Sequence, residues 1–227
     1  MDLELINILL ILVPLILSLI AQNLVFGKYK KYSKITNGRA LTGKEAAERF
    51  LLDNNINDVK VLSTSGTLSD HYDPTKRIVF LSSDVYNGTS VAAVAIACHE
   101  VGHAIQHNQG YSFIKLRALL VKPVQFANQF SWLLIIFGIM LSMGGLFWVG
   151  ITLFSIIALF QLVTLPVELN ASARANEYLS TYILGDYETQ GVKTVLRAAA
   201  FTYIVGLLAS LAEILRFVLL FLNSERD

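Results

Sequence analysis

The chain has 227 residues, of which 54% are hydrophobic and 15% charged, and its mean hydropathy is +0.56. This composition excludes an ordinary soluble domain and indicates an integral membrane protein. The formal net charge of +1 provides no global basic field, so we expect no nucleic-acid partner. The single cysteine, Cys98, excludes an intramolecular disulfide bond.

A first membrane span is predicted from Leu5 to Phe26, which contains few polar residues. The residues before it lack the positive charge of a signal peptide, so we expect a retained anchor over residues 1–27. Basic residues follow directly, namely Lys28, Lys30, Lys31, Lys34 and Arg39. By the positive-inside rule, this end of the span faces the cytoplasm.

A small α+β element is expected after this anchor. Thr42 and Glu45 have the spacing of a capping box and predict a short amphipathic helix. Val59–Leu62 and Arg77–Leu81 are predicted as two short strands joined in a loose hairpin. The segment Lys76–Leu81 is interpreted either as an edge strand that aligns a peptide substrate or as a strand that only packs the domain.

The segment from Ser90 to His107 contains the pattern His99-Glu100-x-x-His103 in an apolar setting. Ser90 is a suitable N-cap, and the apolar run predicts a helix buried on nearly all sides. Residues four apart share one helical face, so both imidazoles can bind one metal ion. Glu100 can then hold and deprotonate a metal-bound water, as in zinc proteases. The alternative is two ordinary buried histidines at a chance spacing.

A third ligand must come from a distant segment, because a catalytic zinc uses three protein ligands and keeps one open position. His107 lies eight residues beyond His99, roughly 12 Å along a helix axis, which is too far to share the ion. We expect Glu168, the first acid after the 37 uncharged residues Ser131–Val167, because an unpaired carboxylate there would be costly. Glu177 is the second candidate. The other interpretation of Glu168 is an interfacial acid at a helix start.

Three further spans are predicted. Ser131–Val167 is too long for one span, and Ser142–Gly145 offers a turn, which predicts a two-span hairpin. Ala198–Leu222 is a fourth span in which Glu213 and Arg216, three residues apart, are expected to pair.

The expected fold is a mainly α integral membrane protein with about four transmembrane helices and a small α+β zincin-like cytoplasmic element that carries the HExxH helix. We divide the chain into an N-terminal anchor (1–27), a cytoplasmic zincin-like catalytic region (28–130), a two-span hairpin (131–167), a cytoplasmic helical segment with the third zinc ligand (168–197), and a C-terminal transmembrane helix with its tail (198–227).

Several segments together resemble the YugP-like neutral zinc metallopeptidases of bacterial membranes. The segments that carry this resemblance cover most of the chain and are Leu68–Pro74, Leu81–Tyr86, Thr89–Ala93, His99–Gln106 and Leu165–Ser172. Such proteins look like relatives of the integral-membrane gluzincins, which implies His99, His103 and Glu168 as zinc ligands and Glu100 as the base. The chain differs from the gluzincin pattern at Ser172, one turn after Glu168, where many gluzincins have an acidic residue that orients a histidine.

The expected reaction is peptide-bond hydrolysis with one Zn²⁺ per chain. Zinc lowers the pKa of its bound water to about 7, and Glu100 accepts the proton. His71, Tyr72 and Arg174 are candidates for stabilising the oxyanion or contacting substrate. Asn170 is a candidate for a hydrogen bond to a zinc ligand. The alternatives are local packing in a turn for His71 and Tyr72, and surface polar groups for Asn170 and Arg174.

The expected location is the bacterial plasma membrane, with several passes and the catalytic site on the cytoplasmic side. The partners are then the lipid bilayer and a protein or peptide substrate, either a membrane protein or an unfolded segment. A membrane protein partner or a homo-oligomer remains open. A catalytically silent membrane scaffold or interaction protein with a bound zinc is the alternative function, although structural zinc sites commonly use several cysteines. Metal transport fits poorly because the spans carry few polar ligands.

Overall fold

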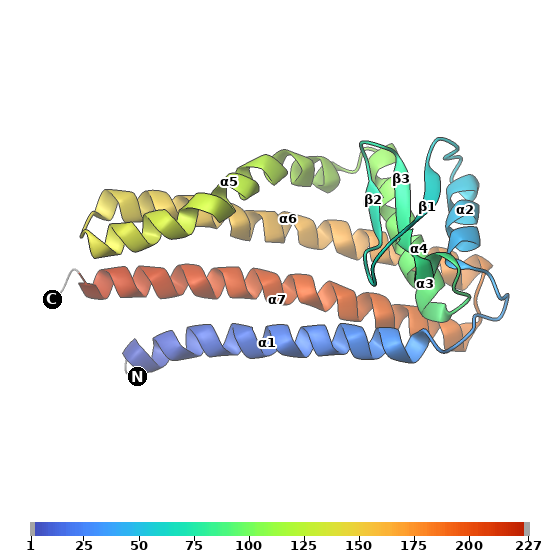
Figure 1. Cartoon of the computed structure of the whole chain (residues 1–227), viewed down its shortest axis with the longest axis horizontal. Helices are drawn as coiled ribbons and strands as arrows, with labels where there is room; N and C mark the ends of the chain where they lie inside the picture. Colours follow the sequence, from blue (N-terminus) through green and yellow to red (C-terminus); the bar gives the residue numbers. More distant parts are fainter. Residues whose placement is uncertain (1–2, 225–227) are drawn as a thin grey trace. The chain divides into compact units, whose positions relative to one another are not determined.

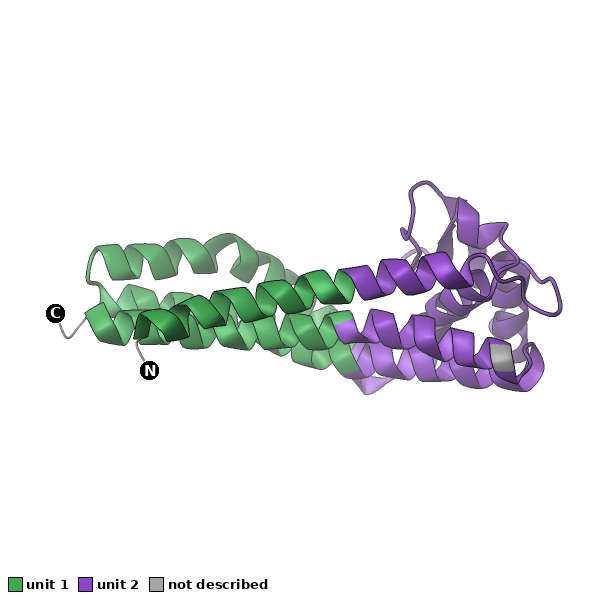
Figure 2. Cartoon of the chain, turned by 90° about the horizontal axis from the view of Figure 1, so that it is seen from below, with its two compact units in different colours: residues 1–22, 115–165, 202–227 green, residues 23–114, 166–201 purple. Residues whose placement is uncertain are grey.

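The computed structural model describes residues 3–224 and divides the chain into two compact units, which are coloured separately in Figure 2. We call residues 1–22, 115–165 and 202–227 the helical unit, and residues 23–114 and 166–201 the site unit. The ends of the predicted anchor and of the predicted tail, residues 1–2 and 225–227, lie outside the described residues.

Among residues 3–224, four helices are long and apolar enough to cross a membrane, in agreement with the predicted mainly helical membrane protein. They are α1 (Leu3–Tyr32), α5 (Ser112–Met140), α6 (Gly144–Tyr182) and α7 (Asp186–Ser224). At 39 residues, α6 and α7 are each roughly 58 Å long, well beyond the ~30 Å hydrocarbon thickness of a bilayer. A part of each helix therefore extends past the apolar layer.

The helical unit is packed around aromatic side chains. Its buried cluster comprises Ile135, Phe147, Ile151, Phe154, Phe217 and Phe221 from α5, α6 and α7. The predicted turn between the middle spans is present, because α5 ends at Met140 and α6 begins at Gly144. Gly138 allows the two helices to approach here, since a Cβ at this position would lie 2.5 Å from the backbone nitrogen of Phe147.

Glu213 and Arg216 pair within α7, as predicted for charged residues in an apolar span. The Arg216 Nε donates to Glu213 Oε2 at 3.0 Å, and the guanidinium lies over the ring of Phe217, 4.6 Å from its centroid. The pair neutralises both charges inside the helical unit.

The site unit contains a three-stranded sheet, ordered β1-β3-β2, beside helix α4 (Val91–Asn108), as Figure 1 shows. Strand β1 (Lys60–Thr64) pairs parallel with β3 (Ile78–Ser82), and β2 (His71–Asp73) pairs antiparallel with the other side of β3. The predicted hairpin between the first and last strands is therefore wrong. The chain makes β2 before it returns, and this additional strand lets β1 and β3 run parallel.

The predicted role of Lys76–Leu81 as a substrate-aligning edge strand is also wrong. Strand β3 lies in the centre of the sheet, with hydrogen-bonded neighbours on both sides. Its backbone groups are used within the sheet, so none are left for a peptide. The two edges belong to β1 and β2.

Two short helices complete the site unit, α2 (Gly43–Asp53) and α3 (Ser83–Tyr86). The predicted capping box opens α2: the Thr42 hydroxyl accepts a hydrogen bond from the Glu45 backbone N–H, and the Glu45 carboxylate accepts one from the Thr42 N–H. The apolar face of α2, with Ala46, Ala47 and Phe50, is buried in the same core as α4. This core holds the site helix rigidly.

Candidate metal centre

Helix α4 carries the two histidines of the motif. It begins as predicted, with the Ser90 hydroxyl accepting a hydrogen bond from the Ala93 N–H at 3.1 Å. Most of its residues are buried, as the apolar run predicted. One turn apart on this helix, the rings of His99 and His103 lie edge to face with centroids 4.8 Å apart. Both imidazoles therefore lie side by side on the same face of α4.

Glu168 of α6 meets the two histidines. Its Oε2 lies 3.2 Å from His99 Nε2 and 3.5 Å from His103 Nε2, although it is 69 and 65 positions away in the sequence. Glu168 is only 3% exposed, and it lies in the middle of a continuous helix. The helix-start interpretation of Glu168 is therefore wrong.

These three side chains fit a zinc ion. A tetrahedral zinc with bonds of about 2.0–2.1 Å has neighbouring ligand atoms about 3.3 Å apart, close to the two distances from Glu168 Oε2. The three ligand atoms all lie within 4.8 Å of one another, and this is the one such group found among residues 3–224. Two imidazoles and one carboxylate are also a donor set that zinc accepts in catalytic sites.

The approach of α6 to α4 depends on Gly102, which lies between the two histidines. A Cβ on Gly102 would lie 2.8 Å from the Ala171 carbonyl oxygen and 3.0 Å from its Cα. These are backbone atoms and cannot move aside as a flexible side chain could. The absence of a side chain at Gly102 thus lets the backbone carrying Glu168 reach the histidines.

Each histidine makes a hydrogen bond through the ring nitrogen that faces away from Glu168. The Ser172 hydroxyl lies 3.1 Å from His99 Nδ1, and the Gln106 side-chain oxygen lies 3.0 Å from His103 Nδ1. Both contacts leave the Nε2 atoms directed at the carboxylate. Such partners orient metal-binding histidines in zinc proteins.

The pKa of His103 is raised above its ordinary value of 6.5. Burial lowers it, but the hydrogen bond with Glu168 and the charges of Glu100 and Glu168 outweigh the burial. The site is thus electronegative without a cation, which suits a divalent metal ion.

Glu100 follows His99 directly on α4 and is half-buried. Its negative charge acts on Asp70, whose pKa is raised mainly by burial and further by Glu100. Asp70 accepts hydrogen bonds from the Ser82 backbone N–H at 2.7 Å and from the Ser82 hydroxyl. These hydrogen bonds hold the loop before β2 against the end of β3, beside α4.

The other predicted contact residues occupy different places. The Tyr72 hydroxyl lies 3.2 Å from His107 Nδ1, one turn beyond His103 on α4. His71 is exposed, stacks on Phe80 and holds its Nδ1 2.8 Å from the Ser69 carbonyl oxygen. Tyr72 therefore reaches the face of α4 that carries the histidines.

Arg174 and Asn170 belong to a hydrogen-bonded chain behind the metal centre. The Arg174 Nε donates to Asn170 Oδ1 at 2.8 Å, and the same oxygen accepts from Gln106 Nε2 at 3.0 Å. Arg174 is thus engaged away from the ligand atoms. Asn170 reaches His103 only through Gln106.

Sequence reasoning missed Gly102 and Gln106 and misjudged Ser172. Gln106 lies three residues after His103, a spacing at which side chains on one helix meet, so it could have been identified. Ser172 lies four residues after Glu168, at the position where an acidic residue is expected by resemblance to the gluzincins. Its hydroxyl contacts His99 in place of a carboxylate. No local pattern marks Gly102, because its neighbour Ala171 lies 69 positions away.

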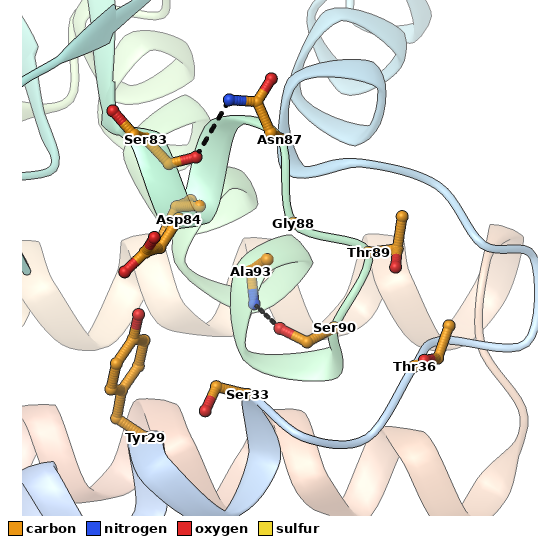
Figure 3. Close-up of a pocket in the computed structure, with 11 residues that line it drawn as sticks. Tyr29, Ser33, Thr36, Ser83, Asp84, Asn87, Gly88, Thr89, Ser90 and Ala93 are labelled. Carbon is orange, nitrogen blue, oxygen red and sulfur yellow. Dashed lines mark hydrogen bonds between the residues drawn. The ribbon is translucent and has the colours of Figure 1, made fainter.

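A separate polar cavity of about 660 Å³ opens at the start of α4. In Figure 3 the Tyr29 hydroxyl points toward the Asp84 carboxylate, and Ser90 caps the helix at the far side. The cavity lining contains no histidine or cysteine. It therefore adds no ligand to the metal centre.

Four membrane-length helices and a group of two histidines and one glutamate define a helical membrane protein with a candidate metal site. The family described as "Putative neutral zinc metallopeptidase" matches residues 7–222, so the chain belongs to this family. It is 46% identical over 212 residues to the "Putative membrane protease YugP" of Bacillus subtilis, which covers 93% of this chain and 94% of the relative. No solved structure matches the chain.

Proposed function

We propose that the protein is a gluzincin-like zinc metallopeptidase that cleaves peptide bonds of membrane or unfolded proteins. His99, His103 and Glu168 would together hold one Zn²⁺ per chain. The observation that carries the proposal is the convergence of His99 Nε2, His103 Nε2 and Glu168 Oε2 at distances suited to one ion.

The chemistry divides between the ion and Glu100. When bound, zinc supplies a water of lowered pKa and polarises the scissile carbonyl. Glu100 takes a proton from the attacking water and then passes it to the leaving amine. The position of Glu100 between the two histidines, on a rigid buried helix, supports this role.

Substrate is aligned along β2. This strand is an edge of the sheet, so its outer backbone groups can pair with an extended peptide. The hydroxyl of Tyr72, in β2, contacts His107 one turn beyond His103 on α4 and is the proposed donor to the developing oxyanion. His71 is the proposed substrate contact on the same strand.

The catalytic site faces the cytoplasm. The basic residues at the end of α1, Lys28, Lys30 and Lys31, favour this side by the positive-inside rule. Lys115 and Arg117 at the start of α5 favour it as well. Substrates are then segments at the inner membrane surface.

The experiment is zinc analysis and cleavage of an unfolded reporter by the full chain in detergent, for the native protein and Glu100→Gln. The variant should keep zinc and lose roughly 10²–10⁴-fold in rate, because only the proton transfer is removed. If native protein binds zinc and cleaves nothing in the presence of membrane or unfolded substrates, the scaffold function replaces the peptidase. An active Glu100→Gln variant would contradict Glu100 as the base.

A further inference from the structure

Gln106 is a polar side chain buried completely next to the metal centre, with 0% of its surface exposed. It lies on α4, one turn after His103, and bridges to α6. Its side-chain nitrogen donates to the Val167 carbonyl oxygen at 2.7 Å and to Asn170 Oδ1 at 3.0 Å. Its oxygen lies 3.0 Å from His103 Nδ1. All of its strong hydrogen-bonding groups are thus used.

The orientation of this amide is determined by its partners. A backbone carbonyl such as that of Val167 can only accept a hydrogen bond, so the Gln106 nitrogen must face it. Asn170 Oδ1 already accepts from the Arg174 Nε, which can only donate. Both partners of the Gln106 nitrogen are therefore hydrogen-bond acceptors. Flipping the amide would bring the Gln106 oxygen against the Val167 carbonyl oxygen and Asn170 Oδ1, with no hydrogen between them.

The orientation of Gln106 dictates which nitrogen of His103 carries the proton. The Gln106 oxygen can only accept, so His103 Nδ1 must be the N–H. In the neutral imidazole the lone pair is then on Nε2, the atom that faces Glu168. This is the form of the ring that can bind a metal ion.

We infer that Gln106 is a positioning residue that fixes the tautomer of His103, and that Arg174 and Asn170 fix Gln106 in turn. The inference rests on the proposed zinc site and extends it by three residues. Arg174 and Gln106 both donate to Asn170 Oδ1, and His103 Nδ1 donates to the Gln106 oxygen. Each of these contacts allows only one arrangement of donor and acceptor.

His99 lacks such a constraint. Its Nδ1 contacts the Ser172 hydroxyl, which can rotate to donate or accept. The hydroxyl therefore orients the ring of His99 without choosing its tautomer. Of the two partners at Nδ1, only Gln106 at His103 requires a proton on that nitrogen.

The test uses full-length protein in detergent with ¹⁵N-labelled histidine imidazoles, at alkaline pH. Nitrogen NMR separates protonated from unprotonated ring nitrogens and reports the His103 tautomer without zinc; competition with a chelator then gives the zinc Kd. In Gln106→Met, His103 should populate both tautomers, and the zinc Kd should rise about 10- to 100-fold. Gln109→Met, an exposed site at the end of the same helix, should leave both measurements native.

A second pair of variants covers the case in which Gln106→Met fails to fold. Arg174→Met removes the donor that fixes Asn170 and should also mix the His103 tautomers, whereas Arg174→Lys keeps a donor and should restore them in part. An unchanged tautomer in either folded variant, Gln106→Met or Arg174→Met, overturns the inference. Absence of zinc binding in native protein would instead overturn the proposed metal site, so the two failures are distinguishable.

Discussion

Gly102 of α4 faces Ala171 of α6 so closely that a methyl group on Gly102 would lie 2.8 Å from the Ala171 carbonyl oxygen. The contact joins the helix with two proposed zinc ligands to the helix with the third. A single missing side chain therefore sets the separation between His99 and Glu168, and this separation can be tested directly.

Gly102→Ala should force the helices apart. We expect the free energy of unfolding to fall by about 1–3 kcal/mol through overpacking, and zinc to bind more weakly because Glu168 retreats. Thermal unfolding and zinc titration in detergent measure the two effects. Gly27→Ala is the matched control, because a Cβ there meets nothing within 4 Å. A Gly102→Ala protein with native stability and zinc affinity would contradict the close packing.

Zinc affinity should fall as the solution becomes acidic. The pKa of His103 lies above 6.5, so protons begin to compete with the metal above that pH. The stability of the metal-free protein should change in the opposite direction and increase as the solution becomes acidic. A raised folded-state pKa contributes stability that is fully present below the unfolded value of about 6.5 and is lost as pH rises through the folded value.

The measurements for this prediction are zinc Kd and the unfolding temperature of metal-free protein at several pH values between about 5.5 and 8.5, the range in which histidine titrates. Glu168→Gln is the comparison, because it removes the carboxylate that raises the pKa of His103. A zinc Kd independent of pH across this range would disprove the assignment of His103 as a ligand.

Tyr72→Phe tests the proposed oxyanion donor. Removal of the hydroxyl should lower kcat by about 10²–10³-fold while zinc content stays native, because the hydroxyl contacts His107 and no zinc ligand. Tyr111→Phe, a half-buried tyrosine just beyond α4, is the control and should keep full activity. Native kcat in Tyr72→Phe would exclude this tyrosine and leave His71 as the candidate.

The side of the membrane can be read with introduced cysteines. Cys98 is fully buried, and burial raises the pKa of its thiol, so the native chain should not react with a membrane-impermeant maleimide. Thr75→Cys, exposed in the turn before β3, should be protected in intact cells and labelled after lysis. Met143→Cys, in the turn between α5 and α6, should be labelled in intact cells. The reverse pattern would place the site outside.

Local signals in the sequence predicted much of the fold. Ser90 was expected to begin the site helix and Thr42 the short helix before it, because capping depends on residues three positions apart. The four long helices followed from apolar length alone. Each of these features depends on residues that are close together in the sequence, so it can be predicted from the sequence alone.

Features that depend on distant residues were missed. The three-residue strand His71–Asp73 is too short to give a recognisable sequence pattern. Without this strand, the sequence predicts an edge strand at Lys76–Leu81, where the structure has the central strand of the sheet. The partners of Gln106 on α6 could not be inferred either, since they lie more than 60 positions away. Glu168 was an exception because a carboxylate in an apolar stretch demands a partner.

The most direct test of the account is the zinc content of purified protein, for the native chain, Glu168→Gln and Glu177→Gln. Glu177 is the exposed acid on the same helix that was the second candidate from the sequence. We predict one zinc per chain in the native protein and in Glu177→Gln, and loss of zinc in Glu168→Gln during dialysis. Zinc retained by Glu168→Gln at the native level, or lost from Glu177→Gln, would contradict a site built from His99, His103 and Glu168.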